Sequence, residues 1–116
     1  MKETFGERIR RIRKEQNLGL RETAKLIGKS ATFLSRVETG KEQVTPAEET
    51  IRKLAKVLGD DFNELMQLAG RIPTEVKDYF TTDPDIPEFL RLAKEKRVSG
   101  EKLLEMLRKA EKGKRK

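Results

Sequence analysis

Residues 5–41 read FGERIRRIRKEQNLGLRETAKLIGKSATFLSRVETGK, and apolar side chains recur along this stretch at the spacing of α-helices. The spacing predicts three helices, at about 5–16, 20–27 and 31–38. β-branched residues do not gather into the runs that strands require. This stretch is therefore expected to fold as three short helices joined by tight turns.

The turn between the second and third of these helices consists of Gly28, Lys29 and Ser30. Gly28 is suited to end one helix, and Ser30 is a suitable N-cap for the next, which Gly40 ends. A turn of this length joins the two helices of a helix-turn-helix, whose second helix can lie in a DNA major groove. Because generic helix pairs share this geometry, the turn alone does not decide between DNA recognition and simple packing.

Two more helices are expected at about 47–58 and 62–69. Thr45 is a candidate cap for the first of them, and Asp61, three residues before Glu64, resembles a capping box that opens the second. Together the five helices are enough to form a compact bundle with its own core.

The last 46 residues predict about three more helices. A sixth follows Pro73, a seventh is capped by one of the two aspartates that flank Pro84, and an eighth is capped by Ser99. The fold class is therefore all-α. We expect a five-helix domain at 1–70 and a helical extension at 71–116.

The composition excludes several kinds of site. The chain has 116 residues without Cys or His, so disulfides, thiolate or imidazole metal sites and catalytic triads that use either residue are excluded. No metal and no cofactor is expected. Uncharged stretches are far shorter than the roughly 18 apolar residues of a transmembrane helix, and no apolar leader follows Met1. We therefore expect a cytoplasmic protein.

Charge is distributed unevenly along the chain. The 27 Lys and Arg against 20 Asp and Glu give a net charge of +7, with +5 in residues 1–45 and +5 in residues 97–116. Such a pattern is expected where two ends face phosphates, although a basic tail such as residues 113–116 is more often a frayed, solvated end. Net charge alone therefore does not identify the partner.

Residues 5–41 resemble the lambda repressor-like, or xenobiotic-response-element, family of helix-turn-helix regulators. The residues that match the family at its spacing are Leu18, Ala24, Gly28, Ser30, Leu34, Val37, Glu38, Gly40 and Leu54. The resemblance continues through IRKLAKVLG at 51–59 and FNELMQLAG at 62–70, so it covers about the first 70 residues. It implies a transcriptional regulator whose partner is double-stranded DNA.

The resemblance also implies that the third helix reads base edges. The outward side chains that would contact bases are Ala31, Thr32, Ser35 and Arg36. Arg36 is the leading candidate, because a guanidinium can bridge the O6 and N7 acceptors of guanine. The alternative role for Arg36 is a surface salt bridge.

Phosphate contacts, which position the domain without selecting a sequence, are implied at the start of the second helix and around the third. The candidates are Arg21, Phe33 through its backbone, Thr39 and Lys41. The chain departs from the family pattern at Gly19 and Leu20, where a Ser or Thr cap and a Gln are usual. Arg21 is expected to substitute for the contact that this removes.

Two further sets of residues are expected to have structural roles. By resemblance, Arg13 and Glu38 pair the first helix with the end of the third. The extension needs cover for its apolar faces, either from the first domain, from a second chain or from another protein. A homodimer or partner interface is expected to include Phe89, Leu103, Leu104 and Leu107.

These observations favour a sequence-specific DNA-binding transcriptional regulator, expected to be a repressor that binds an inverted-repeat operator as a dimer. The alternative is an antitoxin-like or other protein-binding module in which DNA binding is secondary or absent. An enzyme is not expected, because carboxylate pairs such as Asp60 and Asp61 stand at helix starts, where acidic caps are usual.

Overall fold

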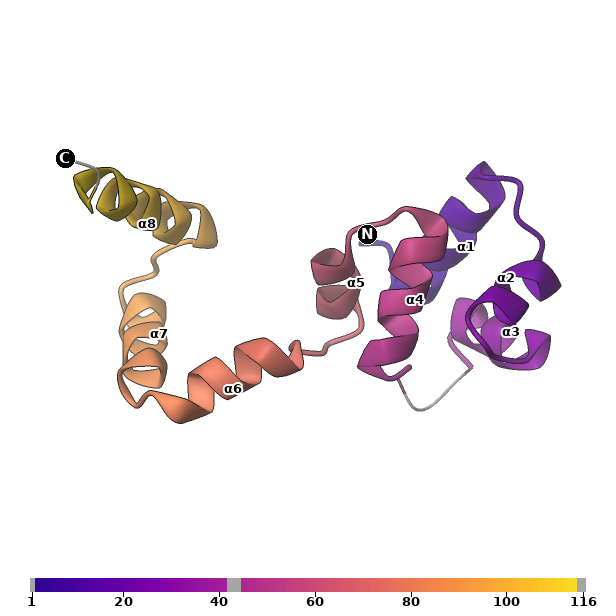
Figure 1. Cartoon of the computed structure of the whole chain (residues 1–116), viewed down its shortest axis with the longest axis horizontal. Helices are drawn as coiled ribbons and strands as arrows, with labels where there is room; N and C mark the ends of the chain where they lie inside the picture. The colour runs from indigo at the N-terminus through magenta and orange to yellow at the C-terminus, as the bar shows by residue number, and fades with distance from the viewer. Residues whose placement is uncertain (1, 42–44, 115–116) are drawn as a thin grey trace. The chain divides into compact units, whose positions relative to one another are not determined.

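The computed structural model describes residues 2–41 and 45–114. Within these ranges the chain forms eight α-helices and no strand, so the all-α fold predicted from the apolar periodicity is confirmed (Figure 1). No helix in the described part of the chain is both long and apolar enough to cross a membrane. The chain divides after Pro73 into two compact units.

The first unit is a five-helix bundle (Figure 1). Its helices are α1 (Phe5–Glu15), α2 (Leu20–Leu26), α3 (Ala31–Thr39), α4 (Glu48–Leu58) and α5 (Phe62–Leu68). Helix α1 packs against α3 and α4, α2 packs against α3, and α4 packs against α5. The largest fully buried hydrophobic side chains of the core are Ile9, Ile27, Leu34, Ile51, Leu54, Leu58, Leu65 and Met66.

Local capping signals set the helix ends. At the start of α1 the Thr4 hydroxyl accepts from the Glu7 amide at 3.1 Å, and the Glu7 carboxylate accepts from the Thr4 amide at 2.8 Å. This capping box was not among the sequence expectations. Ser30 caps α3 as predicted, while Gly40 and Gly59 end α3 and α4 with left-handed φ angles of 77° and 68°.

Some of the expected capping interactions are absent. Thr45 does not cap α4, because the N-cap position of that helix is Ala47, whose side chain has no acceptor. Asp61 does cap α5 by accepting from the Glu64 amide at 2.9 Å. Glu64 does not complete the expected capping box, however, because the Asp61 amide donates to the Asp60 carboxylate at 2.7 Å instead.

Close packing joins α1 to the other helices of the bundle. A Cβ at Gly6 would overlap the carbonyl oxygen of Val37 and would lie 2.8 Å from that of Glu38, so only glycine permits this approach of α1 to α3. On another side of α1, Arg8 donates through Nε and Nη2 to the two carboxylate oxygens of Asp60 at 2.9 and 2.6 Å. These hydrogen bonds raise the pKa of Arg8 above its ordinary value.

The second unit consists of α6 (Thr74–Thr82), α7 (Asp85–Glu95) and α8 (Gly100–Lys114). Asp83 accepts from the Asp85 amide at 2.9 Å, but the N-cap position of α7 is Pro84, so neither aspartate is the N-cap residue that the sequence predicted. Ser99 accepts from the Lys102 amide at 3.1 Å at the start of α8, as predicted. Among the described residues of this unit, Ala93 alone is a buried hydrophobic residue. Its large exposed apolar side chains are Val76, Tyr79, Phe80, Phe89, Leu90, Leu92, Leu104, Met106 and Leu107. In the described chain this unit therefore leaves most of its large apolar side chains exposed.

Thr23 offers a test of the packing in α2. Its side chain is fully buried in the first unit, and its hydroxyl has no hydrogen-bond partner. An unpaired buried hydroxyl costs about 1–3 kcal/mol, and valine replaces it with a methyl group of similar shape. We expect Thr23→Val to raise the free energy of unfolding by about 1 kcal/mol in chemical denaturation. Thr32→Val, at an exposed position of α3, is the matched control. Loss of stability in Thr23→Val alone would mean that the hydroxyl has a partner.

Candidate nucleic-acid interface

Helix α3 has a buried face and an outward face. Leu34, Val37 and Glu38 are buried against the bundle. The residues predicted to contact bases lie on the remaining surface of the helix: Thr32 and Arg36 are exposed, while Ala31 and Ser35 are half-buried. The structure therefore brings all four to the accessible side of α3.

The short turn between α2 and α3 presents this helix. Gly28 adopts a left-handed φ of 72°, and the Lys29 amide donates to the Ala24 carbonyl oxygen at 2.9 Å. Ser30 then opens α3 by accepting from the Phe33 amide at 3.0 Å. The backbone thus turns from one helix to the next within the four residues 27–30, a short connection of the kind that joins a helix-turn-helix.

A buried ion pair fixes α3 against α1, as expected. Arg13 donates through Nε and Nη2 to the two carboxylate oxygens of Glu38 at 2.8 and 2.9 Å, and the two side chains are only 10% and 4% exposed. The third donor, Nη1, reaches the Leu18 carbonyl oxygen at 2.8 Å. Hydrogen bonding to Glu38 raises the pKa of Arg13 above its ordinary value, so the guanidinium stays charged. One side chain therefore holds α1, the turn before α2, and α3 together.

The arginines of helices α1 to α4 fall into two groups. Those that form ion pairs with carboxylates are Arg8, Arg11, Arg13 and Arg52. Those that form no ion pair with any described residue are Arg10, Arg21 and Arg36. Arg8 and Arg13 join α1 to distant parts of the bundle, while Arg11 and Arg52 pair with carboxylates close to them in the sequence. The unpaired arginines keep their hydrogen-bonding capacity for an external anion or base. In the described structure Arg36 is therefore not the surface salt bridge that was its alternative role.

The residues predicted to contact phosphates differ in availability. Arg21 in the first turn of α2 and Lys41 just beyond α3 are exposed. The Phe33 amide already donates to Ser30, and the Thr39 hydroxyl donates to the Ser35 carbonyl oxygen at 2.9 Å. Contacts from Phe33 and Thr39 would therefore require these hydrogen bonds to be shared or exchanged.

Lys29 is a further cation beside α3, and the sequence leaves open whether it contacts DNA or is a solvated loop charge. Its Nζ lies 5.4 Å from the centroid of the Phe33 ring, so the side chain rests beside the first turn of α3. No sequence signal distinguishes it from a solvated loop lysine, because the contact depends on how the turn folds.

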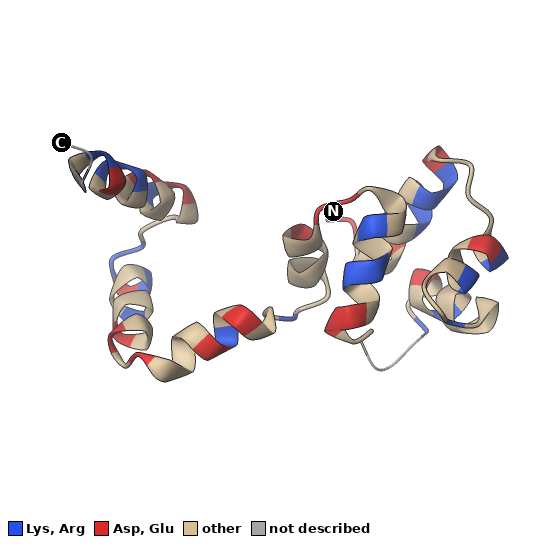
Figure 2. Ribbon diagram, in the orientation of Figure 1, with Lys and Arg blue, Asp and Glu red and all other residues tan. Residues whose placement is uncertain are grey.

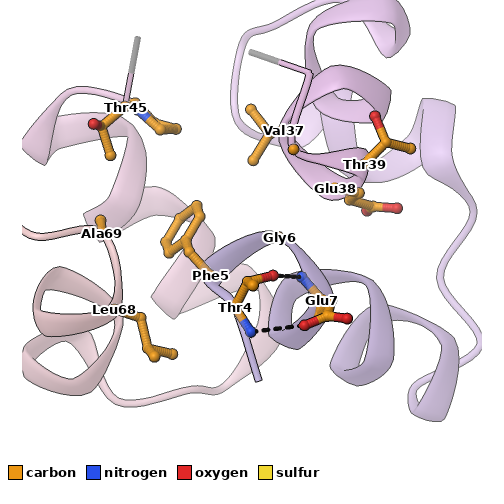
Figure 3. Close-up of a pocket in the computed structure, with 12 residues that line it drawn as sticks. Thr4, Phe5, Gly6, Glu7, Val37, Glu38, Thr39, Thr45, Leu68 and Ala69 are labelled. Atoms are coloured by element: carbon orange, nitrogen blue, oxygen red, sulfur yellow. Dashed lines mark hydrogen bonds between the residues drawn. The ribbon is translucent and has the colours of Figure 1, made fainter. Parts of the chain in front are cut away.

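Figure 3 shows a hollow at the start of α1 and the ends of α3 and α5. Phe5, Val37 and Leu68 are among its lining residues. The Glu7 carboxylate beside this hollow accepts a hydrogen bond from the Thr4 amide, and the Glu7 amide donates to the Thr4 hydroxyl (dashed lines in Figure 3). Within the described residues no group of His, Cys, Asp and Glu is arranged to hold a metal ion.

A tight turn leads into one exposed helix, and a buried ion pair fixes the inner face of that helix to the bundle. This arrangement defines a helix-turn-helix domain. Residues 6–71 match a family model described as a helix-turn-helix domain, and the chain belongs to that family. The match spans more than half of the 116 residues and includes all of α1 to α5 except Phe5, the first residue of α1.

Two curated relatives come from Bacillus subtilis (strain 168). The chain is 43% identical over 70 residues to the HTH-type transcriptional repressor RghR, an alignment that covers 60% of this chain and 51% of that protein. It is 36% identical over 77 residues to the uncharacterized HTH-type transcriptional regulator RghRB, which covers 64% and 55% of the two chains. The chain therefore spans about half the length of the curated relatives it matches. Both relatives are named as transcriptional regulators and not as enzymes.

Two solved structures are similar to the chain. The master regulator for biofilm formation SinR, in complex with DNA, matches with a TM-score of 0.50 and 28% identity over 54% of this chain and 98% of that one. The complex of SinR and SinI matches with a TM-score of 0.51 and 24% identity over 97% of this chain and all of that one. The second likeness supports the fold alone.

The Arg13 ion pair gives a prediction about stability. Glu38→Ala leaves a buried guanidinium without its counter-charge, and removing one partner of a buried pair costs about 3–5 kcal/mol. We expect a loss of about 3 kcal/mol in the free energy of unfolding measured by chemical denaturation. Glu49→Ala removes the exposed carboxylate that faces Lys53 at 3.8 Å and serves as the control, expected to cost less than about 1 kcal/mol. Equal losses in the two variants would contradict a central role for the buried pair.

Proposed function

We propose that the chain is a sequence-specific transcriptional regulator that binds double-stranded DNA through α3 and acts as a repressor. The observation that carries this proposal is Arg36, an exposed guanidinium without an ion-pair partner in the described structure, on a helix whose inner face is held by Arg13 and Glu38. The identity of 43% to a named repressor and of 28% to a regulator solved with DNA supports it. Such a regulator would act in the cytoplasm, where the sequence predicts that it resides.

Recognition would take place in the major groove. Arg36 can donate two hydrogen bonds to the O6 and N7 atoms of one guanine, which discriminates by about 1–3 kcal/mol against other bases. Ala31 and Thr32 carry methyl groups that can contact thymine, and the hydroxyl groups of Thr32 and Ser35 can hydrogen-bond to base edges. Because these side chains share one accessible face of α3, they can reach consecutive bases.

Phosphates on either side of the groove would be held by the cations that flank α3. Arg21 precedes it and Lys41 follows it, and neither forms an ion pair with a described residue. Phe33 and Thr39 would add contacts by exchanging their present hydrogen bonds. Each neutralised phosphate releases counterions, so affinity for every duplex should fall with salt.

The second unit would make the regulator a homodimer. A small three-helix unit with one buried hydrophobic residue in its described part needs a partner surface. Within the proposed interface Phe89, Leu104 and Leu107 are 50–59% exposed, and Leu103 is half-buried. A two-fold dimer would read an inverted repeat with half-sites about one helical turn, or roughly 34 Å, apart.

The exposed apolar residues of the second unit also favour a second candidate function, in which this unit binds a different protein in the manner of an antitoxin. In that case a protein would co-purify in fixed proportion with the chain, and DNA selection would enrich no sequence. A homodimer that selects an inverted repeat would exclude this alternative as the main activity.

Selection of bound duplexes from a random library, at about 0.15 M salt, tests base recognition. We expect the chain to enrich an inverted repeat with a guanine in each half-site. Arg36→Ala should lose that guanine preference by about 5- to 150-fold, the equivalent of 1–3 kcal/mol, and keep its affinity for unspecific duplexes. Equal losses on all sequences would contradict a base-reading role for Arg36.

A second measurement separates phosphate contacts from base contacts. We expect Arg21→Ala to weaken binding to specific and unspecific duplexes alike, and to reduce the slope of log affinity against log salt by about one. Lys56→Ala, in the last turn of α4, removes the same charge away from α3 and should leave the slope unchanged. A loss of sequence preference in Arg21→Ala would show instead that it contacts a base.

A further inference from the structure

The second unit carries its charges in two separate segments. Residues 74–89, here the acidic segment, contain five acidic side chains and one basic, a net charge of −4. Residues 90–114, here the basic segment, contain nine basic side chains and four acidic, a net charge of +5. Figure 2 shows red bands on α6 and at the start of α7, and blue bands on α8.

These opposite charges do not neutralise each other within the described chain. The ion pairs of the second unit join Glu105 to Lys102 at 3.7 Å and to Lys109 at 3.2 Å, all within α8. Glu75 and Glu88 of the acidic segment form no ion pair with a described residue. The same holds for the Arg108 and Lys112 side chains of the basic segment. All four are exposed.

The unpaired charges border the exposed apolar faces. Side chains four residues apart on a helix are neighbours. Glu75 is such a neighbour of Tyr79 on α6, and Glu88 of Leu92 on α7, while on α8 Arg108 is a neighbour of Leu104. By the same spacing Lys94 is a neighbour of Leu90 and Glu111 of Leu107, so the borders carry both signs. Acidic charges are in excess beside the apolar residues of the acidic segment, and basic charges are in excess in the basic segment.

We propose that the cover is a second copy of this chain in antiparallel orientation, with the acidic segment of each copy facing the basic segment of the other. A two-fold interface places the same patch on both partners, so the patch must complement itself. The two segments satisfy this condition, since each meets its opposite across a two-fold axis, whereas a parallel pairing would set like charges against each other. This inference rests on the homodimer proposed above and adds its orientation and its dependence on salt.

Reciprocal charge reversal in the full chain tests the orientation. One variant carries Glu75→Lys and Glu88→Lys, and the other carries Arg108→Glu and Lys112→Glu. Sedimentation at about 0.05 M salt, where screening is weak, should show the homodimer dissociation constant of each variant raised about tenfold or more. An equimolar mixture should form a heterodimer close to the original affinity, because every facing pair is again of opposite sign. Lys53→Glu with Lys56→Glu on α4 gives the same net charge as the second variant and should dimerise like the unaltered chain.

The outcomes separate the two proposals without using DNA. Weakened homodimers and a restored heterodimer, from variants whose circular dichroism retains the helices, would support the antiparallel pairing. An unaltered chain that dimerises equally well at about 0.05 and 0.5 M salt, with variants that do the same, would overturn the charge pairing and leave the homodimer standing. A chain that is monomeric up to high concentration would overturn the homodimer itself, whereas DNA selection tests α3 independently.

Discussion

The buried guanidinium of Arg13 is the constraint on which the presentation of α3 depends. It has two hydrogen bonds to Glu38 and one to the Leu18 carbonyl oxygen, so it satisfies acceptors on two segments that are separated in the sequence. A buried charge that loses a partner is far more costly than an exposed one, and the three segments are therefore fixed together. The outward direction of Arg36 follows, because Glu38 lies two residues away on the inner side of the same helix.

Helix ends and the existence of each helix could be predicted because their causes are local. Gly28 and Gly40 mark positions where a left-handed residue is needed, and the structure has both. Which side chains are buried was less predictable in short helices. At the end of α2 two adjacent apolar side chains could face the core, and the structure buries Ile27 while Leu26 stays 57% exposed. A helix of seven residues has too few turns for its periodicity to distinguish adjacent positions, so the packing against α3 decides.

The candidate site could be predicted only in part, because its chemistry depends on residues distant in the sequence. The pairing of Arg13 with Glu38 spans 25 residues and was expected only from the family resemblance. The spacing of residues in the sequence does not show which arginine side chains of a basic chain form ion pairs. Arg8 finds its partner Asp60 at 52 residues' separation, whereas Arg36 finds none in the described structure. That distinction needs the positions of the carboxylates in three dimensions, and it leaves Arg36, the leading candidate from its place on α3, available for base contact.

The charged residues of the two units are proposed to have different roles, and salt weakens the interactions of both. In the first unit, cations without partners are available for phosphates, so their binding weakens as counterions accumulate. In the second unit, the acidic and basic segments are proposed to attract across a dimer axis, and that attraction is also screened. If dimerisation is coupled to operator binding, the measured salt dependence of operator affinity contains both contributions and exceeds what the phosphate contacts alone produce. The number of phosphates contacted can then be derived from the salt slope only after the dimer equilibrium has been measured without DNA.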